Sequence, residues 1–239
     1  MLTFSDLIIL AMIFFGQATV GALTSYLALQ HTDQSISAEL SFDEAANWGG
    51  TVTESVLLAI VWAYLRLRCF DFSQLKLSID RWTIPLTVLL FASAGAASDL
   101  YQELHFTVLP HHGVAHADAD VPVGGGPAGD SALDDQAMLL SQASLSLVIF
   151  SLLNGFFEEL FFLGLVFCVN RRHLPIAIAF SLFVRFIFHI YQGWVGALAV
   201  TLMGVVFLLF RRRIDSLLPF MLAHAAFDML GLGVLQLIP

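Results

Sequence analysis

The chain has 239 residues, of which 58% are hydrophobic and 12% are charged, and its mean hydropathy is +0.83. Because about a quarter of the residues in a soluble domain are charged, this composition excludes a soluble globular protein and indicates a polytopic membrane protein. The formal net charge of -9 points to no particular partner, since acidic and basic residues lie in different parts of the chain. We expect one membrane domain over residues 1–239, embedded in a lipid bilayer and without a nucleic-acid partner.

Seven apolar runs are long enough to predict membrane-spanning helices. They cover residues 6–30, 48–66, 83–100, 138–168, 174–191, 194–210 and 217–237. No basic residue precedes the first run, which is also longer than the apolar part of a signal peptide, so we expect a retained helix. The predicted fold is an all-α polytopic membrane protein with about seven transmembrane helices.

The ten basic residues predict how these helices are oriented. Nine of the ten follow the second, fourth and sixth predicted helices: Arg66, Arg68, Lys76, Arg81, Arg171, Arg172, Arg211, Arg212 and Arg213. The opposite connections, 31–47 and 101–137, contain no lysine or arginine. By the positive-inside rule the amino terminus is cytoplasmic and the carboxyl terminus lies outside. The compact length favours a prokaryotic cytoplasmic membrane.

Two connections are longer than turns. Residues 70–82 mix apolar and charged positions and end in Trp82, which predicts a short helix on the cytoplasmic surface. Residues 101–137 form the predicted external loop, which is flexible because its composition is rich in Gly, Pro, Ala and Asp. This composition favours a solvated loop over a metal site for its four histidines, His105, His111, His112 and His116.

Two adjacent carboxylates, Glu158 and Glu159, interrupt the fourth apolar run. A charged side chain at the centre of a bilayer costs about 2.5 kcal/mol or more, so such residues indicate a functional site. Neighbouring side chains on a helix point about 100° apart, so both carboxylates cannot serve one site equally. We expect one to perform the chemistry and the other to support it.

The later predicted helices carry further polar residues at helical spacing. Arg185 and His189 are four residues apart, as are His224 and Asp228, so each pair shares a helix face. Counting about 1.5 Å per residue from the cytoplasmic basic residues and His173 places Glu158, His189 and His224 roughly 16–24 Å along their helices. We therefore expect three helices to converge on one buried polar cluster.

A carboxylate with two histidines is suited to hydrolysis. The carboxylate can activate water, and the imidazoles can ligate a metal or hydrogen-bond an oxyanion. The same residues can instead form an interhelical lock of Glu–Arg and His–Asp pairs. The spacing alone leaves both alternatives open.

Three motifs in the carboxy-terminal half resemble those of the CPBP family, the CAAX-protease and bacteriocin-processing intramembrane proteases related to the Ras-converting enzyme. The family pattern is EExxxR, FxxxH and HxxxN or HxxxD on successive hydrophobic segments. The matching residues are Glu158-Glu159, His189 and His224-x-x-x-Asp228. The resemblance implies that about residues 150–235 form the catalytic helices. In the amino-terminal half, only the number of predicted spans supports the resemblance.

Two positions depart from the family pattern. Leu163 stands where the family has its motif arginine, and Arg185 stands four residues before His189, where the family has phenylalanine. We hypothesise that Arg185 replaces the missing charge by pairing with Glu159 or Asp228.

The resemblance implies an endopeptidase that cleaves a peptide or membrane-protein substrate near or within the membrane. By motif, Glu158 is the general base and Glu159 its supporting acid. His189 and His224 are ligands of Zn²⁺ or partners of the water and oxyanion, with Asp228 assisting. The family is described both as metal-dependent and as glutamate-dependent, and this sequence, which has no HExxH helix, is compatible with either.

Three other functions compete with the protease. A seven-helix photoreceptor is excluded, because the single lysine, Lys76, lies in a predicted loop and cannot hold retinal within a span. A catalytically inactive scaffold or bacteriocin-immunity factor ranks second, because the motif arginine is absent. A proton-coupled transporter using Glu158, His189 and Asp228 ranks third, since the sequence shows neither a repeat nor paired broken helices.

Overall fold

The computed structural model describes residues 1–31, 44–108 and 144–230, and this part of the chain is helical. Its seven α-helices are α1 (Phe4–His31), α2 (Glu44–Leu67), α3 (Thr83–Val108), α5 (Leu145–Glu159), α6 (Leu174–Phe188), α7 (Gly193–Arg211) and α8 (Leu218–Leu230). Shorter helical segments are the 3₁₀ turns η1 (Phe72–Leu75), η3 (Val166–Cys168) and η4 (Ile190–Gln192) and the π-helix η2 (Leu160–Leu165).

Within the described residues, five segments are long and apolar enough to cross a bilayer: Phe4–Ala28, Glu44–Leu67, Thr83–His105, Leu145–Cys168 and Ile190–Arg211. α6 and the described part of α8 are also apolar but have only 15 and 13 residues, which is shorter than the about 20 residues that a span needs. The chain is therefore an all-α polytopic membrane protein, as its composition predicts. The orientation of its termini and its organisation as one domain stay predictions.

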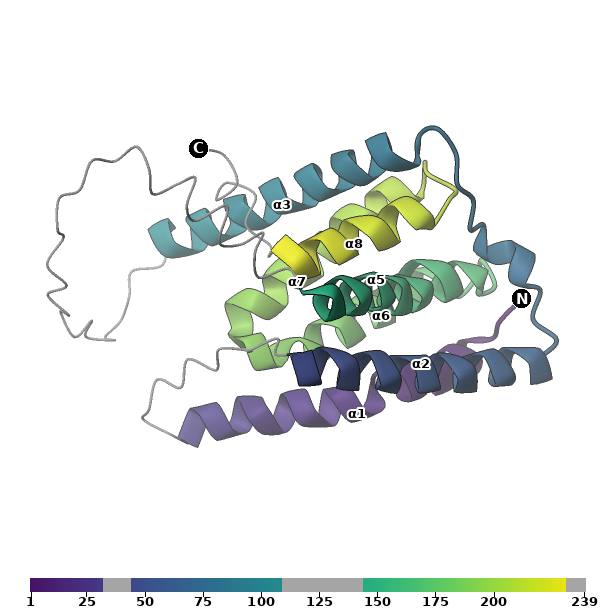
Figure 1. Cartoon of the computed structure of the whole chain (residues 1–239), viewed down its shortest axis with the longest axis horizontal. Helices are drawn as coiled ribbons and strands as arrows, with labels where there is room; N and C mark the ends of the chain where they lie inside the picture. The colour runs from purple at the N-terminus through teal and green to yellow at the C-terminus, as the bar shows by residue number, and fades with distance from the viewer. Residues whose placement is uncertain (32–43, 109–143, 231–239) are drawn as a thin grey trace, which may run out of the picture.

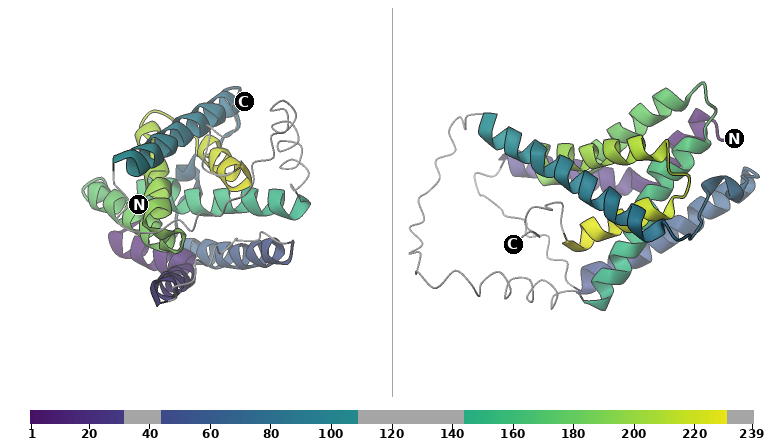
Figure 2. Two further views of the ribbon diagram at one scale, coloured as in Figure 1. Left: turned by 90° about the vertical axis from the view of Figure 1, so that its left-hand side faces the viewer. Right: turned by 90° about the horizontal axis from the view of Figure 1, so that it is seen from above.

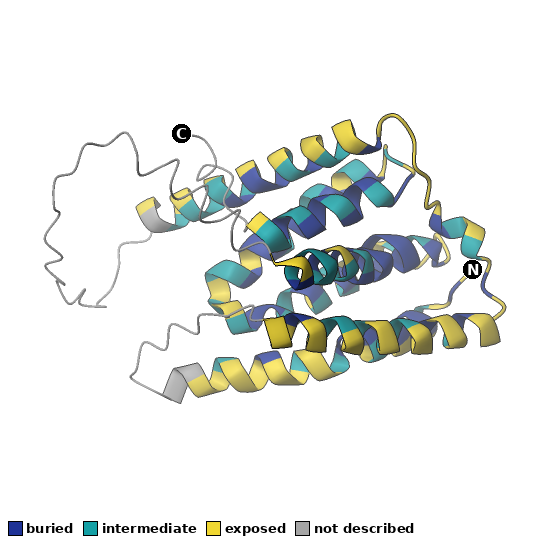
Figure 3. Ribbon diagram, viewed as in Figure 1, coloured by how far each residue is buried: buried dark blue, intermediate teal, exposed yellow. Residues whose placement is uncertain are grey.

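α5 occupies the centre of the bundle (Figure 1). α2 and α8 pack against α5, while α1 packs against α6, and α3 packs against α7 and α8. Figure 2 gives the same order from the side, with α1 and α2 at one edge and α3 at the opposite edge. Burial follows this arrangement, because the end of α5 and the following η2 are buried whereas the outer faces of α1, α2 and α3 are exposed and apolar (Figure 3). Such faces suit contact with lipid tails.

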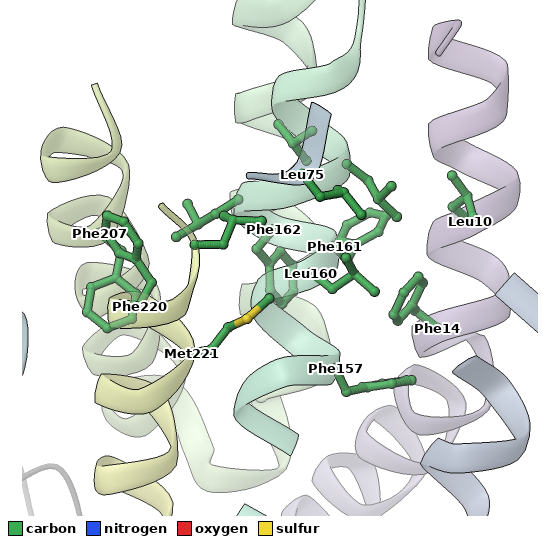
Figure 4. Packing of buried hydrophobic residues seen from close by; sticks show 14 of the residues in the cluster. Leu10, Phe14, Leu75, Phe157, Leu160, Phe161, Phe162, Phe207, Phe220 and Met221 are labelled. Carbon is green, nitrogen blue, oxygen red and sulfur yellow. The ribbon is translucent and has the colours of Figure 1, made fainter. Parts of the chain in front are cut away.

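Phenylalanine rings fix α1 against α5. Phe14 and Phe15 of α1 contact Phe157 and Phe161, with ring centroids 4.7–5.9 Å apart. Figure 4 shows Phe14 facing Phe157 and Phe161 from the neighbouring helix. Each aromatic pair of this kind contributes about 0.5–1.5 kcal/mol beyond the apolar area that it buries. Because Phe157 is turned toward α1, the next residue, Glu158, is turned away from α1 and toward α8.

The connections differ from the prediction in two places. Within residues 70–82, where the sequence predicts a surface helix, the structure has the single turn η1. Lys76 ends that turn in the left-handed conformation, and its carbonyl accepts a hydrogen bond from the Leu217 amide at 3.2 Å. The backbone after η1 therefore holds the α7–α8 turn instead of continuing a helix.

The second difference concerns the predicted external loop. Residues 101–108 extend α3 by about two turns, so His105 lies on a helix. Helix formation continues through this segment because Gly and Pro are confined to the part of the loop that follows. The rest of the predicted loop, 109–137, lies outside the described residues, together with its other three histidines.

Candidate active site

Both adjacent carboxylates lie in the last turn of α5, with 3% of Glu158 and 0% of Glu159 exposed. α5 continues directly into the π-helix η2, and such wide turns are frequent at functional sites. Leu163, which stands in place of the motif arginine, is buried within η2. The carboxylates are thus placed where the helix changes its winding.

Glu159 is held by two cationic or polar donors from two other helices. Its Oε1 atom accepts a hydrogen bond from Arg185 Nη2 of α6 at 2.6 Å and from His224 Nδ1 of α8 at 2.7 Å. Arg185 and Glu159 also form a buried ion pair. Glu159 therefore links α5, α6 and α8, and it is a structural centre of the site.

Arg185 is enclosed on three sides. Its guanidinium lies over the Phe162 ring, with Cζ 4.0 Å from the ring centroid, and donates to Glu159. Gly204 of α7 leaves room for the side chain, since a Cβ atom there would lie only 2.9 Å from Arg185 Cδ. Of the two partners expected for Arg185, the structure brings Glu159 into contact, whereas Asp228 bonds to Asn154 instead.

His224 connects both glutamates with the end of α8. Its Nδ1 atom donates to Glu159, while its Nε2 atom lies 3.8 Å from Glu158 Oε2 and 3.7 Å from Asp228 Oδ1. Gly155 of α5 permits this approach, because a Cβ atom there would contact the Met221 carbonyl oxygen of α8. The Nε2 atom consequently faces two carboxylates.

Asp228 lies at the more open side of the cluster, with 23% of its side chain exposed. It accepts a hydrogen bond from Asn154 Nδ2 at 2.9 Å. Asn154 is four residues before Glu158 and so lies one helical turn away on the same face of α5. That spacing is a signal from which Asn154 could have been predicted as a site residue.

His189 follows the last residue of α6 and is buried. Its Nδ1 atom donates to the Arg185 carbonyl oxygen at 2.8 Å, which leaves the lone pair on Nε2. The ring lies within electrostatic range of Arg185 and His224. The four-residue spacing that predicted a shared face for Arg185 and His189 thus corresponds to a contact through the backbone.

Glu158 differs from Glu159 in its hydrogen bonds. Glu159 Oε1 accepts two, whereas Glu158 accepts none from the described residues, and the Oε2 atom of each is buried without a partner there. The nearest nitrogen of a basic side chain is His224 Nε2, at 3.8 Å, which is beyond hydrogen-bond distance. Adjacent carboxylates therefore occupy different environments, since Glu159 is bound through Oε1 by two donors and Glu158 by none of the described residues.

Glu54 of α2 is a residue that the sequence interpretation missed. Its Oε2 atom is buried without a hydrogen-bond partner in the described part of the chain, and it lies within electrostatic range of Glu158, His224 and Asp228. The signal was present, because Glu54 is an ionisable residue inside the predicted span 48–66.

A zinc site needs three or four ligands at short distances. Within residues 1–31, 44–108 and 144–230, no group of three or more His, Cys, Asp or Glu side chains is arranged to hold a metal ion. Nδ1 of each site histidine is engaged, in His224 by Glu159 and in His189 by a backbone carbonyl, as is usual for histidines that bind a metal through Nε2. The two Nε2 atoms are fewer than the three protein ligands of a catalytic zinc site, and the binding of Zn²⁺ stays a prediction.

Comparison with protein families identifies a match between residues 140–230 and the Rce1-like family, described as type II CAAX prenyl endopeptidase Rce1-like. No curated protein and no solved structure matches the chain. The match extends from just before α5 to the end of α8 and confirms the family resemblance seen in the motifs. The site residues predicted from the sequence all lie within it, whereas Glu54 lies outside.

Proposed function

We propose that this membrane protein, which is Rce1-like over residues 140–230, is an intramembrane endopeptidase that uses Glu158 to activate water. The observation that carries the proposal is that the buried Glu158 carboxylate accepts no hydrogen bond from the described residues, whereas Glu159 accepts two. An unengaged carboxylate oxygen beside an imidazole is what a general base requires. Its neighbour Glu159 is less suited to this role, because Arg185 and His224 already bind it.

The proposed reaction is a hydrolysis carried by side chains alone. Glu158 takes a proton from water while the water oxygen bonds to the carbonyl carbon of the scissile peptide. The C–N bond then breaks, and the proton held by Glu158 passes to the amine nitrogen. In this step His224 carries a proton on both ring nitrogens, so that its Nε2–H, which faces Glu158 and Asp228, can donate to the oxyanion that forms in between.

The remaining residues orient this pair. Glu159 fixes the His224 ring by accepting from Nδ1, and Arg185 balances the charge of Glu159. The contact from His189 to the Arg185 carbonyl fixes the imidazole with a lone pair on Nε2, which can accept a hydrogen bond from the attacking water. The role proposed for each side chain follows from which of its polar atoms already has a hydrogen-bond partner and which does not.

The family description points to a substrate class. CAAX sequences are carboxy-terminal, and their cysteine carries a prenyl chain that associates with membranes. We propose that the substrate is a peptide or membrane protein of this kind, cleaved at the membrane. The apolar outer faces of α1, α2 and α3 are consistent with a lipid-anchored substrate that arrives by lateral diffusion.

The test uses the purified protein in lipid vesicles, with a prenylated CAAX peptide, the same peptide without its prenyl chain, and mass spectrometry of the products. Glu158→Gln should reduce kcat by about 10²-fold or more, the usual contribution of a general base. Asp215→Asn is the matched control, because this exposed carboxylate pairs with Lys76 in a loop outside the cluster. Cleavage by Glu158→Gln at the wild-type rate would contradict the proposal.

A chelator distinguishes the two accounts of the chemistry. If the side chains act alone, activity should survive treatment with 1,10-phenanthroline. Loss of activity that Zn²⁺ restores would instead assign His189 and His224 as metal ligands and would overturn the mechanism proposed above.

A further inference from the structure

α2 lies alongside α5 in a register fixed at two points. The Asn47 side chain donates to Ser146 Oγ at 3.3 Å, across 99 residues of sequence. Gly50 faces Phe150, since a Cβ atom at Gly50 would lie 3.0 Å from Phe150 Cδ2. The two helices therefore run in the same direction, and each residue of α2 lies beside the α5 residue about 100 positions later in the sequence. This offset predicts which residues of the two helices are neighbours further along.

One turn beyond Gly50, Glu54 of α2 comes level with Asn154 of α5. Asn154 donates to Asp228 at 2.9 Å, so Glu54 lies beside the Asn154–Asp228 pair. The electrostatic coupling of Glu54 to Glu158 and to the polar residues of α8 agrees with this placement. The amino-terminal half of the chain thus contributes a carboxyl group to the site.

Burial indicates on which side of the site this carboxyl lies. Glu54, Asn154 and Asp228 are partly exposed, whereas Glu158 and His224 are almost fully buried. The partly exposed residues therefore mark the more open side of the cluster. Glu54 lies on this more open side.

The Glu54 Oε2 atom is nevertheless buried, and it has no hydrogen-bond partner among the described residues. Leaving such a group unpartnered costs about 1–3 kcal/mol, so its presence calls for a physical reason. A bound substrate provides one. A peptide that is extended for cleavage in an apolar environment carries backbone N–H and C=O groups, and each of these costs several kcal/mol when unpaired.

We infer that Glu54 is a substrate-positioning residue whose carboxyl group exchanges a hydrogen bond with a backbone amide of the peptide substrate, next to the scissile bond. The inference rests on the proposed function and extends it, because it places part of the peptide-binding surface on α2. The free Oε2 atom of Glu54 and the unpaired peptide group of the substrate satisfy each other.

The test measures peptide binding without cleavage. In the Glu158→Gln background, adding Glu54→Leu should weaken the binding of a fluorescent prenylated CAAX peptide about 10-fold, as expected for one lost hydrogen bond. Adding Glu54→Gln, which keeps a hydrogen-bonding group, should change Kd by less than about 3-fold. In the otherwise wild-type enzyme, Glu54→Leu should raise KM more than it lowers kcat.

Thr53→Leu is the matched control, because Thr53 is the exposed neighbour of Glu54 and its hydroxyl bonds to the Gly49 carbonyl within α2. It should leave Kd unchanged. Glu54→Leu should keep or raise the melting temperature, since it replaces an unpartnered buried oxygen with an apolar group. Weaker binding in a stable variant cannot then be attributed to unfolding.

The outcomes separate this inference from the proposed function. Equal peptide binding with and without Glu54→Leu overturns the role of Glu54, even if the wild type cleaves the peptide. Binding that depends on Glu54 in a protein without cleavage activity supports the inference and contradicts the protease. Absence of peptide binding to Glu158→Gln overturns both.

Discussion

Arg185 Nη2 lies 2.6 Å from Glu159 Oε1, and the exposed fractions of the two side chains are 1% and 0%. This ion pair joins the first and second motifs, although neither the position nor the helix of the cation matches the family pattern. Leu163 lies on the same chain segment as Glu159, whereas Arg185 reaches Glu159 from α6. The charge that the motif lacks is therefore supplied across a helix interface.

Arg185→Leu should destabilise the protein by about 3–5 kcal/mol, because it leaves Glu159 buried without its cation. The melting temperature measured in detergent should fall, and peptide cleavage should be lost as Glu159 and His224 move. The double variant Arg185→Leu/Glu159→Leu should recover most of the lost stability, since it removes both charges. A single variant as stable and active as the wild type would refute the proposed replacement of the motif arginine.

The family arrangement can be rebuilt in this chain. Arg185→Phe/Leu163→Arg restores the pattern of EExxxR followed by FxxxH, and it should regain at least half of the stability lost in Arg185→Phe alone. The control is Arg185→Phe/Leu165→Arg, because Leu165 is equally buried in the π-helix but six residues from Glu159. It should be less stable than Arg185→Phe. If the two double variants lost the same stability relative to the wild type, an arginine at position 163 could not replace Arg185.

The same substitution at the two adjacent glutamates should have different effects on stability. Glu159→Gln should lower the melting temperature, because Arg185 loses its charged partner. Glu158→Gln should change the free energy of unfolding by less than about 1 kcal/mol, since its Oε2 atom has no hydrogen bond to lose. Thermal unfolding of the two variants in one lipid or detergent condition checks this. Equal destabilisation would contradict the different roles of the two residues.

Much of the fold could be predicted because membrane insertion leaves a simple signal in the sequence. Uninterrupted apolar runs locate α1, α3 and α7, since a span requires about 20 such residues. The η1 segment could not be predicted, because Lys76 uses its backbone to hold Leu217, which is distant in sequence. The π-helix η2 likewise depends on packing that periodicity does not reveal.

The candidate site residues Glu158, His189 and His224 stand out in the sequence because polar groups in a membrane are costly and therefore rare. The contacts between these residues could not be predicted, since they depend on how closely the helices approach one another. The choice of Glu159 over Asp228 as the partner of Arg185 follows from packing between helices. Glu54 was overlooked because the resemblance to a known family covers only the later helices.

Gly204→Ala should disturb Arg185 directly. A Cβ atom at this position would lie 2.9 Å from Arg185 Cδ and 3.0 Å from Nε, so the guanidinium would have to leave Glu159 or α7 would have to move. Overpacking of this kind costs about 1–3 kcal/mol. The cost should shrink in the Arg185→Leu background, where the crowded atoms are absent. A double-mutant cycle on melting temperature measures this coupling, and additive effects of the two changes would contradict the predicted contact.

Gly155→Ala should be more damaging, because the obstruction is backbone and not a movable side chain. The new Cβ atom would contact the Met221 carbonyl oxygen and lie 2.8 Å from the Ala225 amide nitrogen, so α5 and α8 would have to separate. His224 would then move away from both glutamates, and we expect a loss of about 2–4 kcal/mol in stability together with the loss of cleavage. The control is Gly21→Ala in α1, where no atom lies within 4 Å of the added methyl group and helix propensity favours alanine. Wild-type stability and activity in Gly155→Ala would show that the close approach of α5 and α8 is not needed to form the site.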